Sequence, residues 1–160
     1  MKAVVTGAAG FLGSHLVDRL LAEGHDVIAL DVAPGPNLDE AATMARYRFV
    51  AGDIRDPGFV GGVVGADVDI VYHFAAIVGV HKYLADPFAV VDVNVLGTRN
   101  VLAAATDHET RVVVASTSEV FGKNPAIPWR EEDDRVLGST AVDRWSYSTS
   151  KAAAEHLALG

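Results

Sequence analysis

Two side chains near the end of the chain could perform acid–base chemistry together. Tyr147 and Lys151 stand four residues apart, so a helix through this stretch would place both on one face. An ammonium group one turn away can lower the pKa of a phenol, and a phenol tuned in this way can act as a base near neutral pH. Tyrosine and lysine also occur at this spacing on ordinary helix surfaces, so the pair indicates a site only if other features agree.

A second group of polar side chains lies at the end of the mainly apolar run at residues 111–116. This group consists of Ser116, Thr117, Ser118 and Glu119. If the run is a parallel strand, these side chains lie at its carboxyl end, which is where open α/β sheets bind ligands. Each hydroxyl taken singly could instead serve a turn or a helix cap. Their position before the Tyr147 pair favours a role in the same site.

Three glycines near the start of the chain, Gly7, Gly10 and Gly13, point to phosphate binding. They separate an apolar run at residues 2–6 from a stretch with leucines at helical spacing. A turn without side chains lets a pyrophosphate approach the backbone, and the free amides and dipole of the following helix can neutralise it. Gly13 would also let the helix and strand pack closely. The alternative interpretation is a tight turn in some other α/β protein.

An aspartate ends the next apolar run, about twenty residues after the glycines, as in dinucleotide-binding folds. The carboxylate of Asp31 could accept hydrogen bonds from the adenine ribose hydroxyls, whereas it would repel the 2′-phosphate of NADP. No arginine or lysine follows at residues 32–34 to hold such a phosphate. The sequence therefore predicts NAD as the cofactor, with a simple turn role for Asp31 as the main alternative.

The elements that must position these groups alternate between strand and helix, which predicts a doubly wound parallel α/β sheet with right-handed crossovers. We expect one domain over residues 1–160, with an ordered surface loop at residues 123–140. The expected strands are residues 2–6, 26–31, 47–51, 69–74 and 111–116. The first expected helix begins after the glycines and ends near Gly24. The other expected helices cover residues 38–46, 57–64, 87–105 and 146–159.

Composition limits the classes of partner. The chain has 160 residues, a formal charge of −8 and half its residues apolar, which fits one soluble domain and favours neither nucleic acid nor an anionic membrane. Cysteine is absent, which excludes disulfides and thiolate metal sites. The acidic run at residues 131–134 is typical of a solvated face, so no metal is expected. Without a leader or a long uninterrupted apolar run, we expect a cytoplasmic protein.

Taken together, six ordered motifs resemble the extended short-chain dehydrogenase/reductases, the NAD-dependent nucleotide-sugar epimerases and dehydratases. The motifs are TGAAGFLG at residues 6–13, GDI at 52–54, HFAA at 73–76, NVLGT at 94–98, STSEVFG at 116–122 and YSTSK at 147–151. The resemblance runs from residue 2 to the end of the chain. It implies a Rossmann-type NAD-binding domain.

The resemblance also implies roles for individual residues. Tyr147 would be the base that removes a sugar hydroxyl proton, Thr117 would hydrogen-bond that hydroxyl, and Glu119 would belong to the same catalytic segment. Lys151 would also hold the nicotinamide ribose, whereas His73 would be a structural residue of its strand. The implied cofactor-binding set is Gly7, Gly10, Phe11, Leu12, Gly13, Asp31, Asp53, Ile54, Phe74, Ala75, Ala76, Asn94, Tyr147 and Lys151.

Within this family, the reaction is read from residues 116–122. Dehydratases typically carry Asp-Glu after the threonine, where this chain has Ser118 and Glu119. The same string is similar to that of UDP-glucuronate decarboxylases and of UDP-glucose 4-epimerase relatives. Val78 stands where many UDP-galactose 4-epimerases have lysine, and Phe121 stands where tyrosine is usual. The resemblance favours a 4-epimerase-like enzyme, with a decarboxylase or 4,6-dehydratase as alternatives.

The length of the chain bears on the same question. Members of this family are roughly twice as long, and their second half grips the nucleotide sugar. We therefore expect the substrate-binding domain to be missing from this chain. An NAD-binding fragment without turnover of its own is the alternative of a different class. The resemblance also implies a UDP-linked sugar as substrate and a homodimer formed through the helices at residues 87–105 and 146–159.

Overall fold

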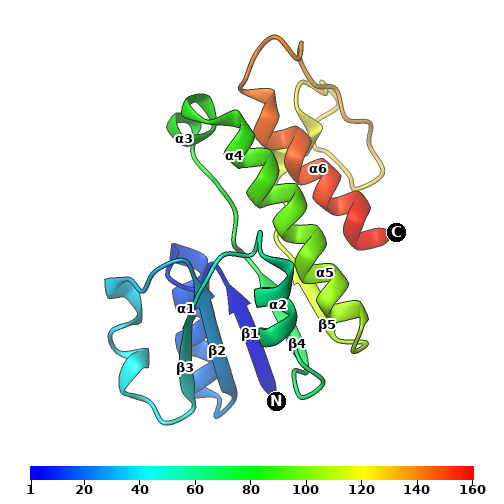
Figure 1. Cartoon of the computed structure of the whole chain (residues 1–160). Helices are drawn as coiled ribbons and strands as arrows, with labels where there is room; N and C mark the ends of the chain where they lie inside the picture. The colour runs from blue at the N-terminus through cyan, green and yellow to red at the C-terminus, as the bar shows by residue number, and fades with distance from the viewer.

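Five parallel strands form the centre of the protein. The computed structural model describes the backbone of the whole chain and the side chains of residues 1–81 and 85–160. The strands lie in the order β3-β2-β1-β4-β5 (Figure 1). From β1 the strands β2 and β3 are added on one side, whereas β4 and β5 are added on the other side. The pair β1 and β4 is therefore the switch point where open α/β sheets form ligand crevices. The strands are β1 (Lys2–Thr6), β2 (Asp26–Asp31), β3 (Tyr47–Ala51), β4 (Ile70–His73) and β5 (Arg111–Val114).

The sheet forms where β-branched and other apolar residues run without interruption. Strands of a parallel sheet are covered on both faces, so their sequences lack the alternation of a half-exposed strand. In β1, every residue after Lys2 is buried, and Val4 lies opposite Ile28 of β2 and Val71 of β4. The expected doubly wound parallel fold is therefore confirmed, and three of the five strands have the expected bounds.

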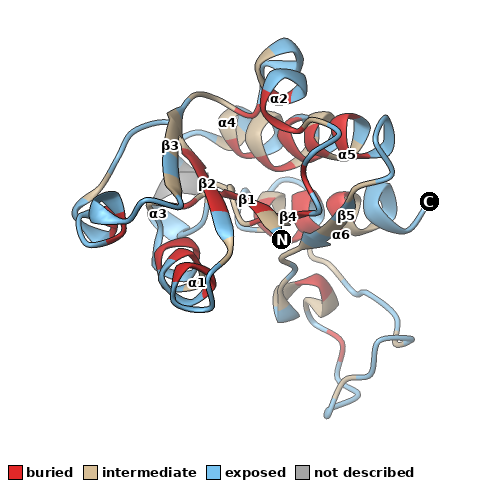
Figure 2. Ribbon diagram, turned by 90° about the horizontal axis from the view of Figure 1, so that it is seen from below, coloured by how far each residue is buried: buried red, intermediate tan, exposed pale blue. Residues whose placement is uncertain are grey.

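Helices cover both faces of the sheet (Figure 2). Helix α1 (Phe11–Ala22) packs on one face through Val17, Leu20 and Leu21. Helices α2 (Pro57–Val63) and α5 (Thr98–Thr106) pack on the other face, where Val60 and Val101 are fully buried. The two apolar clusters on either side of the sheet fix the carboxyl ends of the strands relative to the first turn of α1.

The long helix expected at residues 87–105 is interrupted by a π-helical segment. It begins as α4 (Pro87–Val91), continues through the π segment η3 (Asp92–Gly97) and ends as α5. A short helix α3 (Val80–Ala85) precedes it. The stretch Pro87–Thr106 has the length and composition of a membrane span, with mean hydropathy 1.2. Its last part, α5, packs against β4 and β5, and core helices of other proteins meet the same criteria.

The last helix, α6 (Trp145–Leu159), lies beside α4, η3 and α5 (Figure 1). Before it, the short 3-10 helix η4 (Ser118–Phe121) leads into the loop of residues 123–140. Hydrogen bonds order this loop: Asn124 donates to the carbonyl of Asp134, and the indole of Trp129 donates to the carbonyl of Asn124. The side chain of Trp129 also stacks on Phe121.

Two local expectations were wrong. Residues 38–46 do not form one α-helix: they include the end of the 3-10 helix η1 (Pro36–Leu38), the 3-10 helix η2 (Ala41–Thr43) and a turn that leads into β3. Only Leu38 and Ala41 of this stretch are buried, so no continuous apolar face holds a helix against the sheet. Strand β4 is also one residue shorter at each end than the expected residues 69–74, and β5 is two residues shorter at its carboxyl end than the expected residues 111–116, because the chain turns into loops there.

Candidate functional site

In the glycine turn between β1 and α1, backbone atoms pack directly against other backbone atoms, which leaves no room for side chains. Gly7 has a φ of +68°, and a Cβ there would lie 2.6 Å from the amide nitrogen of Ala75. A Cβ on Gly13 would lie 2.2 Å from the carbonyl oxygen of Gly7. Gly10, at the N-cap of α1, offers no side chain to the first amides of the helix. The amides of Ala8 and Gly10 are bonded to the carbonyls of Leu30 and Gly7, so the main-chain donors that remain are the first amides of α1, at the positive end of its dipole.

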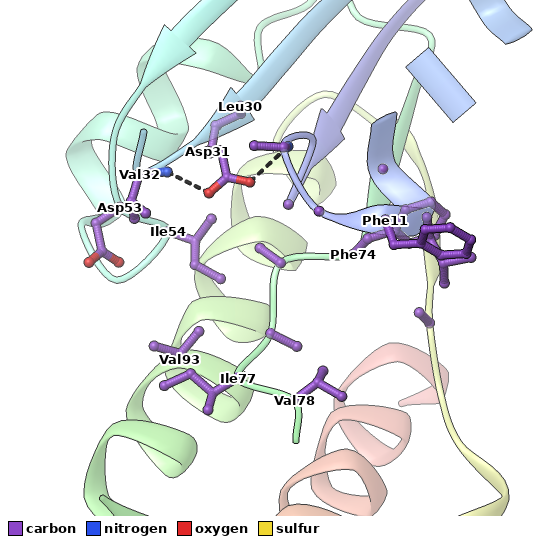
Figure 3. A pocket seen from close by; sticks show the side chains of 18 of the residues that line it. Phe11, Leu30, Asp31, Val32, Asp53, Ile54, Phe74, Ile77, Val78 and Val93 are labelled. Carbon is purple, nitrogen blue, oxygen red and sulfur yellow. Dashed lines mark hydrogen bonds between the residues drawn. The ribbon is translucent and has the colours of Figure 1, made fainter. Parts of the chain in front are cut away.

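These amides face a cavity of about 770 Å³ at the carboxyl ends of the strands (Figure 3). A volume of this order suits a small-molecule or cofactor site. All the residues predicted to bind the cofactor, except Asn94, line it. The fold thus brings the glycine turn, Asp31 and the Tyr147 pair to one place, although more than a hundred residues separate the first from the last.

Asp31 serves the glycine turn directly. Its Oδ2 accepts a hydrogen bond from the amide of Ala9 at 2.9 Å, and its Oδ1 accepts one from the amide of Val32 at 2.8 Å (Figure 3). The carboxylate therefore ties β2 to the turn and still borders the cavity. A carboxylate oxygen has more than one lone pair, so these bonds leave capacity to accept from a ribose hydroxyl.

Asp53 lies on the same side of the cavity and is held by Arg55. The guanidinium donates to both carboxylate oxygens, from Nε to Oδ1 at 3.1 Å and from Nη2 to Oδ2 at 2.6 Å. These bonds hold the pKa of Asp53 below its ordinary value, against a smaller opposing effect of burial. Arg55 also lines the cavity, and it was missed in the sequence although it directly follows the GDI motif.

Tyr147 and Lys151 occupy the opposite wall of the cavity. Both are buried, with exposed fractions of 7% and 6%, and both line the cavity from α6. Burial lowers the pKa of Lys151, and the charge of Glu155 opposes that shift. Glu155 accepts a hydrogen bond from Ser116, which lines the cavity and belongs to the predicted group of hydroxyls at the end of β5. The side chain of Lys151 lines the cavity and is therefore within reach of a bound ligand.

Thr117 and Glu119 lie next to this wall but do not line the cavity. The hydroxyl oxygen of Thr117 caps η4 by accepting a hydrogen bond from the amide of Glu119 at 3.2 Å. Its hydroxyl proton is free of that bond and can be donated elsewhere. The carboxylate of Glu119 lies 4.0 Å from the guanidinium of Arg144 in a partly exposed ion pair.

Asn94 is placed apart from the other cofactor candidates. It is 1% exposed and does not line the cavity. Its Oδ1 accepts from the amide of Ile77 at 2.8 Å, and its Nδ2 donates to Ser150 Oγ at 3.1 Å. Asn94 therefore connects a cavity-lining loop to the helix of Tyr147 rather than facing the cavity itself. Among the described side chains, no cluster of His, Asp and Glu could hold a metal ion.

A parallel sheet that holds its cavity at the switch point, above a glycine turn, defines a Rossmann-type domain. The chain matches the NAD dependent epimerase/dehydratase family over residues 3–160. It belongs to that family, whose members are NAD-dependent nucleotide-sugar enzymes of the extended short-chain dehydrogenase/reductase type. The resemblance found in the six motifs is thereby confirmed.

Relatives in the family catalyse different reactions. The chain is 37% identical over 160 residues to a UDP-N-acetyl-alpha-D-glucosaminuronate decarboxylase of Bacillus cytotoxicus, covering 99% of this chain and 49% of the relative. It is 40% identical over 137 residues to a UDP-glucose 4-epimerase of Mycolicibacterium smegmatis, covering 82% of this chain and 44% of the relative. The chain thus spans about half the length of the curated relatives it matches.

A solved structure shows the same architecture. DesIV, a dTDP-glucose 4,6-dehydratase of Streptomyces venezuelae crystallised as a double mutant with NAD, superposes with a TM-score of 0.86 at 36% identity. The match covers 98% of this chain and 50% of that one. Decarboxylase, epimerase and dehydratase relatives therefore share this half of the fold, and NAD is the cofactor of the family.

Proposed function

We propose that the protein that carries this chain is an NAD-dependent nucleotide-sugar 4-epimerase-like enzyme, and that residues 1–160 form its cofactor domain. The observation that carries the proposal is the common cavity: Tyr147 and Lys151 face the same space as the glycine turn. A base and a cation at the reacting end of a dinucleotide site are what reversible oxidation of a sugar hydroxyl requires.

The residues take distinct parts in this reaction. Bound NAD would supply the acceptor, and later the donor, of a hydride at sugar C4. The Tyr147 oxygen removes the O4 proton as that hydride leaves and returns it at the end of the cycle. The Lys151 ammonium favours the ionised phenol and hydrogen-bonds the ribose. The Thr117 hydroxyl orients O4. A hydride returned to the opposite face of the 4-keto sugar would invert C4.

Decarboxylation is the second candidate, because the decarboxylase relative matches 99% of this chain. The segment at Ser118 and Glu119 also lacks the Asp-Glu pair of the dehydratases. A panel of UDP- and dTDP-sugars, scored separately for C4 inversion, CO₂ release and water loss, tests these reactions. The intact mass of the protein as purified is measured alongside. A 16.8 kDa species that binds NAD without turning over any sugar would favour the binding-domain alternative.

Cofactor choice is expected to depend on Asp31. Substituting Asp31→Asn removes the negative charge that repels a 2′-phosphate but keeps an oxygen for the amide of Ala9. The ratio of NAD to NADP affinity should fall about tenfold or more, because a like charge no longer faces the phosphate. Titration with both cofactors by calorimetry measures this ratio. Asp18→Asn, on the outer side of α1, is the matched control and should leave the ratio unchanged. An unchanged ratio in Asp31→Asn would assign that carboxylate to the turn alone.

The homodimer and the cytoplasmic location expected from the sequence belong to the same proposal. Three apolar side chains along the α4 and η3 helix support a dimer: Phe88, Val91 and Leu96 are 82%, 46% and 47% exposed. Apolar residues exposed together on one helix are typical of a contact surface. Sedimentation velocity should show a dimer that Leu96→Glu weakens, and a monomer at all concentrations for the unmodified protein would contradict it.

A further inference from the structure

A buried histidine outside the cavity connects its two walls. His73, the last residue of β4, is 2% exposed. Its Nδ1 lies 2.7 Å from Thr6 Oγ1, at the end of β1, and its Nε2 lies 2.9 Å from Thr98 Oγ1, at the start of α5. One side of the ring therefore meets the glycine-turn strand, and the other side meets the long helix.

The hydrogen bonds of this group have a fixed direction. Thr98 Oγ1 donates its single proton to the carbonyl oxygen of Asn94 at 2.6 Å, so it must accept from His73 Nε2. Thr6 Oγ1 accepts from the amide of Ala75 at 3.1 Å and then donates to His73 Nδ1. Thr98 thus fixes a proton on Nε2, and in the neutral ring Nδ1 accepts from the Thr6 hydroxyl. Burial, aided by the charge of Lys151, lowers the pKa of His73 to about 4, which agrees with a neutral ring at physiological pH.

The chain of donors ends in the π segment η3. Asn94 lies in that segment, and its carbonyl is the last acceptor of the chain. Its side chain is bound to Ile77, in the loop that lines the cavity, and to Ser150, which lies between Tyr147 and Lys151 on α6. Four successive hydrogen bonds therefore join the glycine-turn strand to the helix of the candidate base. π segments often occur at functional sites, where the altered helix places side chains differently.

We propose that His73 is a positioning residue: through Thr98 and Asn94 it fixes the π segment, and so sets the distance between the cofactor loop and the helix that carries Tyr147. The proposal rests on the proposed function in one respect, namely that NAD occupies the cavity. The two threonines require a side chain between them that accepts a hydrogen bond at one end and donates one at the other, as a neutral imidazole ring does. No side chain with a single polar end could satisfy both threonines.

Thr98→Val tests the proposal, because valine keeps the shape of threonine but removes the acceptor of His73 Nε2. Hydrogen exchange of the η3 amides should become about tenfold faster, and NAD affinity should fall about tenfold, because a buried donor is left without a partner. Exchange in β2 and α1 should not change. Thr98→Ser should restore both properties, since it returns the hydroxyl. Thr106→Val is the matched control: Thr106 makes the same kind of bond, to the carbonyl of Leu102, on the same helix but away from histidine.

A spectroscopic measurement completes the test. The ¹⁵N chemical shifts of the His73 ring in the unmodified protein should show the proton on Nε2 at pH 7, and a proton on Nδ1 would overturn the proposal. Equal NAD affinity and equal η3 exchange in Thr98→Val and the unmodified protein would also overturn it. If the unmodified protein binds no NAD, the proposed function fails, whereas the exchange and ring measurements still decide the role of His73.

Discussion

Replacing Tyr147 with phenylalanine is expected to lower kcat of the sugar reaction by at least about a hundredfold while leaving NAD affinity within about threefold. The substitution removes only the phenolic oxygen, and general acid–base groups contribute on the order of 10²–10⁴ in rate. The ring itself is 7% exposed and packs with Val90, so its removal would disturb the fold, whereas phenylalanine keeps that contact. Steady-state kinetics on the preferred nucleotide sugar, with NAD binding measured in parallel, check the expectation.

Tyr72→Phe is the matched control for this substitution. Tyr72 lies on β4, one residue before His73, and does not line the cavity. Loss of its hydroxyl should leave both kcat and NAD affinity unchanged. Full turnover in Tyr147→Phe would remove the tyrosine from the mechanism. A fall in both NAD affinity and rate would instead assign it a binding role, with no separate part in proton transfer.

Gly13→Ala is expected to destabilise the protein by about 3 kcal/mol or more, which is at the upper end for overpacking of a core. The new Cβ would lie 2.2 Å from the carbonyl oxygen of Gly7 and 2.8 Å from the Cα of Ala8. Both neighbours are backbone, so neither can rotate away, and either α1 or the turn must move. Because the turn lines the cavity, NAD affinity should fall together with stability. Urea unfolding followed by circular dichroism measures the change in free energy of unfolding.

Gly61→Ala provides a control of opposite sign. Gly61 lies in α2, and a Cβ there would meet nothing within 4 Å. Alanine should therefore stabilise the protein by about 0.5–1 kcal/mol, since it restricts the unfolded chain and suits a helix. NAD affinity should not change. A Gly13→Ala protein as stable as the unmodified one would show that the turn can open, contrary to the close contact in the structure.

The strands could be predicted because their apolar runs are bounded by glycine and aspartate, and burial on both faces leaves little freedom of register. The glycine turn and Asp31 could be predicted as cofactor-binding residues for the same reason, because local sequence and the ends of β1 and β2 fix their positions. The stretch at residues 38–46 could not be predicted from composition. Its residues are mostly good helix formers, but tertiary context overrides intrinsic propensity, and tertiary contacts bury only Leu38 and Ala41.

The π segment could not be read from the sequence either. In an α-helix each backbone amide bonds to the carbonyl four residues earlier, and in a π-helix to the carbonyl five residues earlier. Which pattern forms depends on partners outside the helix, here Ile77 and His73. The same dependence explains why Asn94 does not face the cavity, since its amide is committed to Ile77 and Ser150. Arg55 was missed because it lies beside Asp53, a residue with a stronger sequence signal.

The surface that the glycine turn offers to a ligand is made of main chain. Gly7, Gly10 and Gly13 contribute no side chain, and the neighbouring Ala75 is held through its amide. Such a surface carries no charge that a single codon change could reverse. Over evolution, the hydroxyls and carboxylates near Tyr147 can therefore be exchanged, and one reaction replaced by another, while the hold on the cofactor is inherited intact. Decarboxylases, epimerases and dehydratases that share one cofactor domain are what this separation would produce.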